Sequence, residues 1–591
     1  MLNARWHKVL ADLGGNKART ALVVLSIAVG VLAIGMVVGS RGIIERGLAE
    51  SHAAGRFASS TLTTQLFDQP LIEEVRRVPG VAQVEGRRLV GARLSQRAGE
   101  WRDLWLFAVP DYHRIGLSRI KPEAGAWPPP EREILLERAS LAFLKATISD
   151  TVRVEMPDGT QRQVRIAGTA HDLNPPSSGT SGILYGYVTF ETLEWLGEAR
   201  GMNQLHIAVA ERNDDKEHIR RVAAAVREKV EESGRTVFMT TVPDPGKFWV
   251  NDHVQSMMLL LTLLGAVCLC MSGFLVTNII SALLAQQIRQ IGVMKSVGAS
   301  AAEVTVMYLG TIFFFGLLAL AVGIPLGAVA AVGLVLYSTN LLNFDVAGFS
   351  LAPDVLALEV AAGLVVPLLA ALVPVITGSR ITIREAITSY GLGQGEGYGR
   401  FMRLVERIPG VSLATRLSLR NTFRRKSRLL LTLAALTLGG AIFVGVLSVR
   451  DSIVSTLEDA VRYRNYDVEL TFSRPYPVAD LEREASRINS VAKAEAWAVG
   501  AAHRLRTDGN QSDTMTIIGA PVSTELIRPI LLQGRWLQPG DGRDVVVNTD
   551  VLKLEPDIGV GDALRLKVNG KEETWNVVGL VRGVLSGPVI Y

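Results

Sequence analysis

The sequence predicts a membrane α-helical bundle combined with α+β extracytoplasmic domains. Three observations lead to this fold class: five apolar runs long enough to cross a bilayer, polar segments with strand-like alternation between them, and matching segments that recur 409 positions apart. The 591 residues are 48% hydrophobic and 20% charged, which fits no single soluble class. A chain that alternates membrane spans with polar domains accounts for both values.

The five runs are interpreted as membrane spans because each offers about 20 apolar residues, the number that a helix needs to cross the hydrocarbon. The predicted spans are residues 20–40, 255–281, 307–335, 355–377 and 429–449. Buried helices of a soluble protein are the alternative, but uncharged runs of this length recur along the chain. The first run is longer than the core of a cleaved signal peptide and follows the 19-residue segment 1–19, so we expect an uncleaved anchor.

The distribution of Lys and Arg predicts how the chain is oriented in the membrane. Residues 1–19 carry four basic residues against one acidic residue, and residues 378–428 carry eleven against three. Both segments are therefore expected in the cytoplasm together with residues 282–306, whereas residues 41–253 and 450–591 are expected outside it. This topology and contact with anionic lipid explain the net charge of +5. Nucleic acid is not an expected partner, because no aromatic platform accompanies the basic residues.

Matching segments in the two halves of the chain predict an internal duplication. Lys17 and Lys426 precede the first and fifth spans and are 409 positions apart, and Gly125–Trp127 matches Gly534–Trp536 at the same offset. An ordered series of such matches indicates two copies of one unit: a span, a large polar domain and, in the first copy, three more spans. The second copy stops at Tyr591, inside a segment that matches a strand of the first. We therefore expect the intact protein to continue with three further spans.

Both polar domains show α+β patterns. Pro157–Thr160 separates two alternating segments, and Asn569-Gly570 stands at the equivalent place in the second domain, so each predicts a β-hairpin. Helical patches at 71–78, 214–233 and 479–488 interrupt the strands. Trp127 and Trp536 are expected to pack at the edge of a small core, with an aromatic ligand anchor as the alternative.

Motifs that carry catalysis or nucleotide binding are missing from the sequence. It has no phosphate-binding loop, so the chain is not expected to bind ATP, another cofactor or a metal itself. His171 is the one histidine that an acidic residue, Asp172, directly follows, and without a placed nucleophile the pair is expected to be a solvated loop pair. Cys268 and Cys270 lie in one apolar run and point to different helix faces, so they cannot chelate one metal together.

The segment after the second span is the strongest candidate for a functional site. Residues 286–300 predict a short amphipathic helix that ends near Gly298. Such a helix either lies on the lipid surface or presents apolar anchors to a groove in a cytoplasmic partner.

This stretch resembles the signature of FtsX-like permeases. Arg289, Ile291, Gly292, Gly298 and Ala299 carry the resemblance, while Gln290 stands where the family commonly has an acidic residue. The resemblance implies that the segment is a coupling helix for an ATPase. The residues assigned to ATPase coupling are Arg289, Ile291, Gly292, Met294, Lys295, Gly298 and Ala299.

The polar segments 45–250 and 452–591 are similar to MacB-like periplasmic domains. The resemblance as a whole implies a duplicated FtsX-like permease, with an ABC-type ATPase dimer on a separate chain that holds ATP and Mg. It implies that this chain is a non-catalytic, multi-pass subunit of the bacterial plasma (inner) membrane. Membrane lipid is an expected partner, and a periplasmic adaptor or hydrolase is a further one.

Two functions from different classes remain open. The first is a permease subunit that couples ATP hydrolysis to movement of periplasmic domains, for export or extraction of lipids, lipoproteins, peptides or other amphiphiles. The second is a transmembrane regulator that mechanically activates a periplasmic hydrolase or transmits a signal. The spans contain almost no ionisable residues, whereas a solute pathway usually needs some, which favours mechanical transmission.

Overall fold

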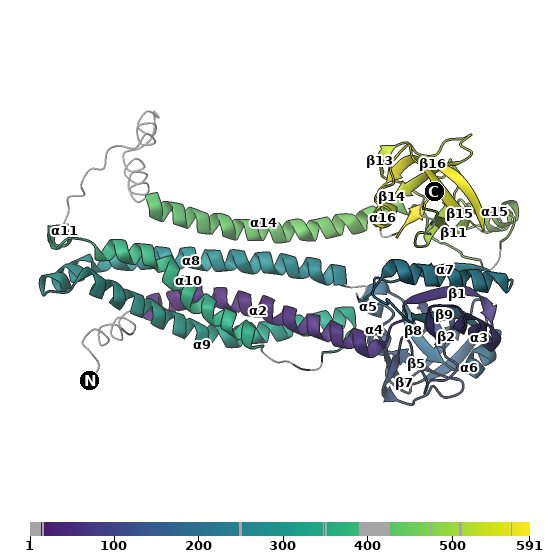
Figure 1. The fold of residues 1–591 in the computed structure, drawn as a ribbon, viewed down its shortest axis with the longest axis horizontal. Helices are drawn as coiled ribbons and strands as arrows, with labels where there is room; N and C mark the ends of the chain where they lie inside the picture. Colours follow the sequence, from purple (N-terminus) through teal and green to yellow (C-terminus); the bar gives the residue numbers. More distant parts are fainter. Residues whose placement is uncertain are drawn as a thin grey trace. The chain divides into compact units, whose positions relative to one another are not determined.

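The structure is a computed structural model that divides into two compact units (Figure 1). It describes residues 14, 17–97, 99–246, 251–346, 348, 352–388, 426–472, 475–506, 511–568, 570–584 and 586–591. The first unit consists of Met1–Leu48, Val250–Asn340 and Asp345–Ser448, and the second of Ala49–Trp249, Leu341–Phe344 and Val449–Tyr591. Most of the predicted segments 1–19 and 378–428 therefore lie outside the described residues.

Five long helices contain the five apolar runs, and by length and composition each can cross a membrane. They are α2 (Lys17–Gly55), α8 (Asn251–Ser296), α9 (Ala301–Leu342), α10 (Pro353–Ser379) and α14 (Lys426–Tyr463). The helices extend well beyond the predicted spans. Most of residues 282–306, expected as a loop after the second span, is therefore helical: only 297–300 separate α8 from α9.

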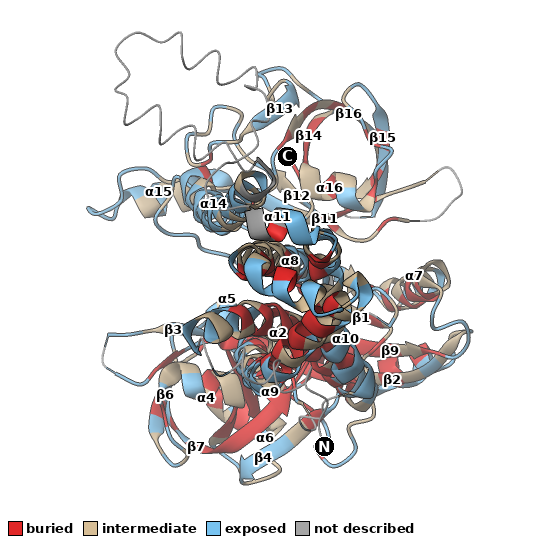
Figure 2. Cartoon of the chain, turned by 90° about the vertical axis from the view of Figure 1, so that its left-hand side faces the viewer, coloured by how far each residue is buried: buried red, intermediate tan, exposed pale blue. Residues whose placement is uncertain are grey.

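Four of these helices share one core in the first unit. Buried residues of α2, α8, α9 and α10 form a single apolar cluster that includes Val31, Ile280, Phe315 and Ala371. The helices α2 and α14, which contain the first and fifth predicted spans, differ in burial. Half of the residues in the most apolar stretch of α2 are buried, whereas none of those in the most apolar stretch of α14 are. The burial colours of Figure 2 show the same contrast. The two helices that the sequence analysis matched to each other therefore have different packing environments.

The first α+β domain (residues 56–246) contains a ten-stranded sheet in the second unit, with the order β10-β1-β9-β2-β3-β8-β5-β7-β4 and β6 pairing with β2 and β7. Its strands are β1 (Ser60–Phe67), β2 (Val81–Ser95), β3 (Arg102–Ala108), β4 (Ile120–Gly125), β5 (Glu133–Glu137), β6 (Thr151–Glu155), β7 (Gln161–Asp172), β8 (Leu184–Val188), β9 (Met202–Val209) and β10 (Val237–Thr241). Its helices are α3 (Gln69–Arg76), α4 (Arg138–Leu144), α5 (Ser178–Ser181), α6 (Phe190–Leu196) and α7 (Lys216–Glu232).

The second α+β domain (residues 464–591) contains a seven-stranded sheet, with the order β13-β16-β14-β17-β12-β11-β15. Its strands are β11 (Ala498–Arg504), β12 (Met515–Gly519), β13 (Leu531–Gly534), β14 (Asp544–Asn548), β15 (Ala563–Val568), β16 (Lys571–Val581) and β17 (Val589–Ile590). Its helices are α15 (Val478–Ser486) and α16 (Thr549–Leu554).

The two sheets share one pairing pattern. β8 runs parallel to β3 and antiparallel to β5, and β17 runs parallel to β12 and antiparallel to β14. β6 bridges β2 and β7 as β15 bridges β11 and β16. Gly125 of β4 lies opposite Gly168 of β7, and Gly534 of β13 lies opposite Gly579 of β16 in the same way. The matches found in the sequence therefore fall on corresponding strands.

The local predictions for these domains are largely confirmed. β6 pairs with β7 across the first predicted hairpin and β15 with β16 across the second, and α3, α7 and α15 occupy the three helical patches. Trp127 and Trp536 each pack against a small apolar cluster. The prediction of a solvated His171-Asp172 pair is wrong, because β7 continues to Asp172 and both side chains are buried. Burial raises the pKa of Asp172, which accepts a hydrogen bond from Tyr187 Oη at 3.0 Å.

Candidate coupling site

The turn between α8 and α9 is fixed by local sequence. Gly298 has a φ of +104°, a left-handed conformation that residues with a Cβ rarely adopt. Its N–H donates to the carbonyl of Lys295 at 3.1 Å, and the N–H of Ala299 donates to the carbonyl of Met294 at 3.0 Å. This pair of bonds is a Schellman motif, which satisfies two carbonyls that the end of α8 would otherwise leave unpaired.

The start of α9 is capped in an equally local way. The N–H of Glu303 donates to Ser300 Oγ at 3.2 Å, and the N–H of Ser300 donates to Glu303 Oε2 at 3.0 Å. This reciprocal arrangement is a capping box. The turn is therefore closed on both sides, and the predicted short amphipathic helix is the last part of the long helix α8.

One side of this segment packs into the bundle. Ile291 is 1% exposed and belongs to the shared core of the first unit, against which Met294 and Ala299 also pack. A Cβ at Gly292 would lie 2.6 Å from the Cβ of Ala386 on α11 (Ile383–Thr388). Two of the seven predicted coupling residues, Ile291 and Gly292, are thus buried parts of the scaffold and do not present anchors at the surface.

Lys295 connects α8 with the chain that follows α10. Its Nζ donates to the main-chain carbonyl of Ile381 at 2.7 Å, between the end of α10 and the start of α11. A cation at this place stabilises carbonyls that lie beyond a helix C-terminus. Lys295 is therefore a positioning residue for α11, together with the contact at Gly292.

The other side of the segment is exposed. Arg289 and Gln290 are exposed, and Val293 and Val297 are 53% and 84% exposed. Arg289, Val293 and Val297 follow one another at four-residue spacing and form one stripe on the helix surface. The sequence prediction missed the two valines, although their spacing from Arg289 was visible in the sequence. We call Arg289, Val293 and Val297 the exposed stripe.

Polar side chains brace the same part of the bundle. Tyr308 Oη donates to Gln287 Oε1 at 2.6 Å and joins α9 to α8. Thr305 Oγ1 and Ser379 Oγ lie 2.8 Å apart and join α9 to α10. These two contacts tie the end of α8 to α9, and α9 in turn to α10.

Beyond α9, Asn343 belongs to the second unit and holds the first α+β domain. Its Nδ2 donates to Glu137 Oε1 at 2.7 Å, and Arg138 Nε donates to its Oδ1 at 2.9 Å. Thr180 Oγ1 donates to the carbonyl of Leu341 at 3.1 Å. Sequence reasoning missed this attachment, because nothing local in the sequence relates residues about 200 positions apart.

An apolar groove lies between α8 and α14 in the first unit. Its volume is about 670 Å³, and its lining includes Leu263, Val267, Cys270, Leu433 and Thr437. Among the described residues, no group of three or more His, Cys, Asp or Glu side chains is placed to hold a metal ion.

Apolar helices of membrane-spanning length, a capped turn between two of them and α+β domains inserted along the chain together define a class of integral membrane protein with large polar domains. Two family models match the chain: "FtsX-like permease C-terminal" over residues 262–383 and "MacB-like periplasmic core domain" over residues 429–590. These two matches relate the chain to the FtsX-like and MacB-like family of ABC transporter permeases. Permeases of this family are non-catalytic membrane subunits that work with ABC ATPases.

Solved structures with similarity to the chain are domains of transporters. The extracellular domain of the noncanonic ABC-type transporter YknZ from Gram-positive bacteria is 14% identical, with a TM-score of 0.22, and the match covers 30% of this chain and 98% of that one. The periplasmic region of MacB from Actinobacillus actinomycetemcomitans is 8% identical, with a TM-score of 0.23, and covers 35% of this chain and 96% of that one. A comparison with curated proteins gave no match.

Proposed function

We propose that this chain is the permease subunit of an ABC transporter in the bacterial inner membrane. A separate ATPase dimer, which holds ATP and Mg, drives movement of the periplasmic domains for export or extraction of lipids, lipoproteins, peptides or other amphiphiles. The observation that carries the proposal is the exposed stripe at the end of α8, next to residues that are locked into the bundle. Such a stripe offers the ATPase an apolar and cationic contact. When the ATPase moves, the helix bundle beneath the stripe is displaced with it.

A continuous path leads away from this contact. The helix α9 begins directly after the capped turn and has 42 residues, which corresponds to roughly 63 Å at the rise of an α-helix. The chain then enters Leu341–Phe344, where Asn343 bonds Glu137 of the first α+β domain. Rigid elements joined by hydrogen bonds support transmission by rigid-body movement.

Movement is favoured over conduction through the bilayer. Asp354 and Glu359 are the only acidic or basic residues between 351 and 377, and the predicted spans 255–281 and 307–335 contain no Asp, Glu, Lys, Arg or His. Pathways for polar solutes in membranes usually contain ionisable groups. The apolar groove between α8 and α14 supports an amphiphilic substrate instead, because its walls suit acyl chains or apolar side chains.

Substitutions in the exposed stripe test the coupling role. In the co-purified complex in nanodiscs, Val297→Glu and Arg289→Glu should reduce ATPase stimulation by the permease roughly tenfold, as expected when an apolar or charged anchor is lost at an interface. Val297→Met keeps an apolar side chain at the same exposed position and should retain stimulation. Full stimulation in both charge-altering variants would show that the ATPase docks elsewhere.

A regulatory role is the second function to be distinguished. The same movement can activate a periplasmic hydrolase, and the test is what the α+β domains bind. Co-purification of an amphiphile or an adaptor supports transport. Stoichiometric recovery of a hydrolase whose activity depends on ATP would replace transport with regulation, while the coupling role of the exposed stripe would stand.

A further inference from the structure

The surface between the two α+β domains within the second unit is built from ion pairs. Arg220 on α7 forms a bidentate pair with Asp513, with Nε–Oδ1 and Nη2–Oδ2 distances of 2.9 and 2.6 Å. The two side chains are only 13% and 15% exposed. Bidentate Arg–carboxylate pairs have a fixed geometry, and withdrawal from water strengthens them.

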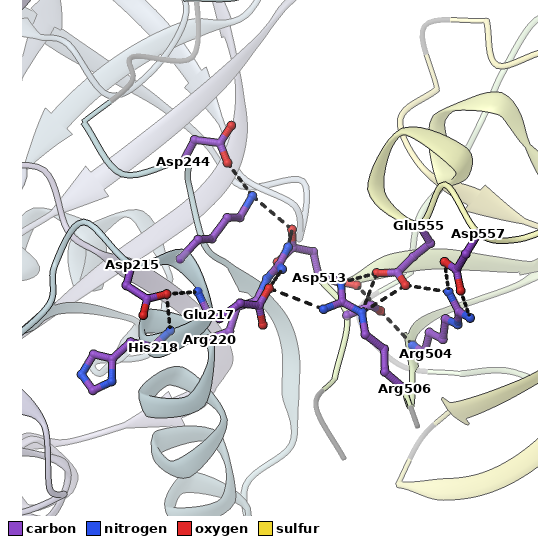
Figure 3. A network of polar contacts seen from close by, with 12 residues as sticks. Asp215, Glu217, His218, Arg220, Asp244, Arg504, Arg506, Asp513, Glu555 and Asp557 are labelled. Atoms are coloured by element: carbon purple, nitrogen blue, oxygen red, sulfur yellow. Dashed lines mark hydrogen bonds and ion pairs between the residues drawn. The ribbon is translucent and has the colours of Figure 1, made fainter. Parts of the chain in front are cut away.

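The network continues into the second α+β domain. Arg506 bonds Glu555 at 2.5 Å and also lies 3.4 Å from Glu217 of α7. Arg504 bonds Glu555 at 2.8 Å and Asp557 at 2.6 Å. Figure 3 shows these contacts as one chain that runs from Asp244 to Asp557. Glu217 and Asp513 each contact arginines, so opposite charges alternate across the surface.

Two further contacts bind the same pair of domains. Thr514 Oγ1 accepts from the N–H of Thr240 at 3.2 Å and donates to its carbonyl at 2.9 Å. Thr240 lies on β10, the edge strand of the first sheet, whose main-chain groups would otherwise be left unpaired on that side. Arg227 of α7 contacts Nε2 of His503 on β11.

Apolar packing does not cross this surface in the part of the chain that the structure describes. The apolar clusters of the first α+β domain contain residues between Leu62 and Val242 only, and those of the second contain residues between Ala460 and Tyr591 only. Permanent interfaces usually bury an apolar core, whereas polar interfaces between domains permit relative movement. The contact has the chemistry of a reversible association.

We infer that this surface is an ionic clasp, by which the second α+β domain docks reversibly on α7 and β10 of the first domain in the same chain. The partner surface is defined by charge: Asp513 of the second domain pairs directly with Arg220 of the first. Arg506 of the second domain lies between Glu555 of its own domain and Glu217 of the first. When the clasp is closed, the two α+β domains move as one rigid body. When it is open, the long helices are the only connection between them. It does not depend on which ATPase drives the permease or on the transported substrate.

Cross-linking in the full-length protein tests the clasp. Cys268 and Cys270 are first replaced by alanine, and Thr240→Cys with Thr514→Cys then reports contact through a short thiol cross-linker. Arg220→Asp should lower the yield of intramolecular cross-link roughly five- to tenfold, and Asp513→Arg should do the same. The double variant Arg220→Asp/Asp513→Arg should restore most of it, which also shows that the single variants had not simply unfolded.

Salt and a remote charge reversal complete the test. Raising NaCl from about 0.1 M to about 1 M shortens the Debye length from about 10 Å to about 3 Å and should lower the yield. Arg76→Asp reverses an exposed arginine of α3, paired with Glu73, and should leave the yield unchanged. Yields that do not respond to either single reversal, or a double variant no better than the single ones, would overturn the ionic clasp. Either of these outcomes would overturn the clasp without bearing on the coupling role of the exposed stripe.

Discussion

Asn343, the first residue after α9, donates from its side-chain amide to Glu137 at 2.7 Å, and both side chains are buried. Glu137 simultaneously caps α4 by accepting from the N–H of Ala139 at 2.6 Å. Asn548 occupies the matching N-cap of α16 in the second α+β domain and bonds the N–H of Val551 and the carbonyl of Gly587. The N-cap residue therefore bonds a distant residue, Asn343, in the first domain, whereas in the second domain it bonds Gly587 of the same domain.

Removing the amide should loosen the attachment. Asn343→Ala removes the short hydrogen bond to the buried Glu137 Oε1, which then keeps only its longer contact of 3.4 Å with His171 Nδ1. The loss should cost about 1–3 kcal/mol of folding free energy. Hydrogen exchange of the full-length protein should show faster exchange of the α4 amides, because the cap residue loses its support. Asn213→Ala, at an exposed position of the same domain, is the control. Unchanged protection of α4 would show that Asn343 does not hold Glu137.

Filling the contact at Gly292 should detach α11. A Cβ there would lie 2.6 Å from the Cβ of Ala386, so Gly292→Ala forces the two segments apart and Gly292→Leu does so more strongly. Overpacking of this kind costs about 1–3 kcal/mol. Limited trypsin cleavage at Arg384 should become faster.

Two variants sharpen this prediction. Gly292→Ala with Ala386→Gly should recover the original cleavage rate, because the methyl group moves from one side of the contact to the other. Gly445→Ala on α14, where a Cβ meets no atom within 4 Å, should have no effect. A slow cleavage rate in Gly292→Leu would contradict the packing role.

Glu359 of α10 should be dispensable for folding. It is fully buried, and neither of its carboxyl oxygens has a hydrogen-bond partner among the described residues. Its Oε1 would lie 3.1 Å from a Cβ at Gly327. Replacing an unsatisfied buried polar group by an apolar one of similar size recovers about 1–3 kcal/mol, so Glu359→Met should raise the apparent Tm of the full-length protein in detergent.

A companion variant at Gly327 tests the packing around Glu359, and ATPase stimulation of Glu359→Met separates a role in stability from a role in function. Gly327→Leu should lower the apparent Tm, because the added side chain competes with the carboxyl for the same space. An apparent Tm that falls in Glu359→Met would refute the structural prediction. A raised Tm with lost ATPase stimulation would identify Glu359 as functional, as ionisable residues within membranes often are.

Acid should weaken the second unit through His503. Burial, and then the Arg227 guanidinium and Lys567, lower the pKa of His503 from 6.5 to about 4, against the opposing Ser512 carbonyl and Glu231. The imidazole is neutral when docked and binds a proton more readily when released. Its contribution to stability is therefore complete above pH 6.5 and is lost as the pH falls towards 4.

Thermal unfolding and the Thr240–Thr514 cross-link between pH 7 and about 4 provide the measurement. His503→Gln removes the titrating group and should flatten the profile in that range. Asp557 of the clasp titrates at lower pH, because Arg504 keeps its pKa below the usual value. A wild-type profile that is flat down to pH 4 would contradict the role of His503.

The sequence determined the local structure of this protein. Long apolar runs gave the five long helices, and alternation with Gly-containing turns gave the two hairpins. Gly298 ends α8 because a left-handed residue after a helix is a local requirement. The matching segments predicted corresponding strands, because similar stretches of sequence have similar periodicities.

Only the tertiary structure decided which groups meet. The sequence placed Ile291 among surface anchors, but packing against the other helices buried it and left Val293 and Val297 exposed. It left His171-Asp172 in a solvated loop, although neighbouring strands enclose both residues. Contacts such as Asn343–Glu137 and Arg220–Asp513 join residues more than 200 positions apart. Periodicity fixes the faces of an element, but the partner of each face depends on how distant segments pack, which no local pattern records.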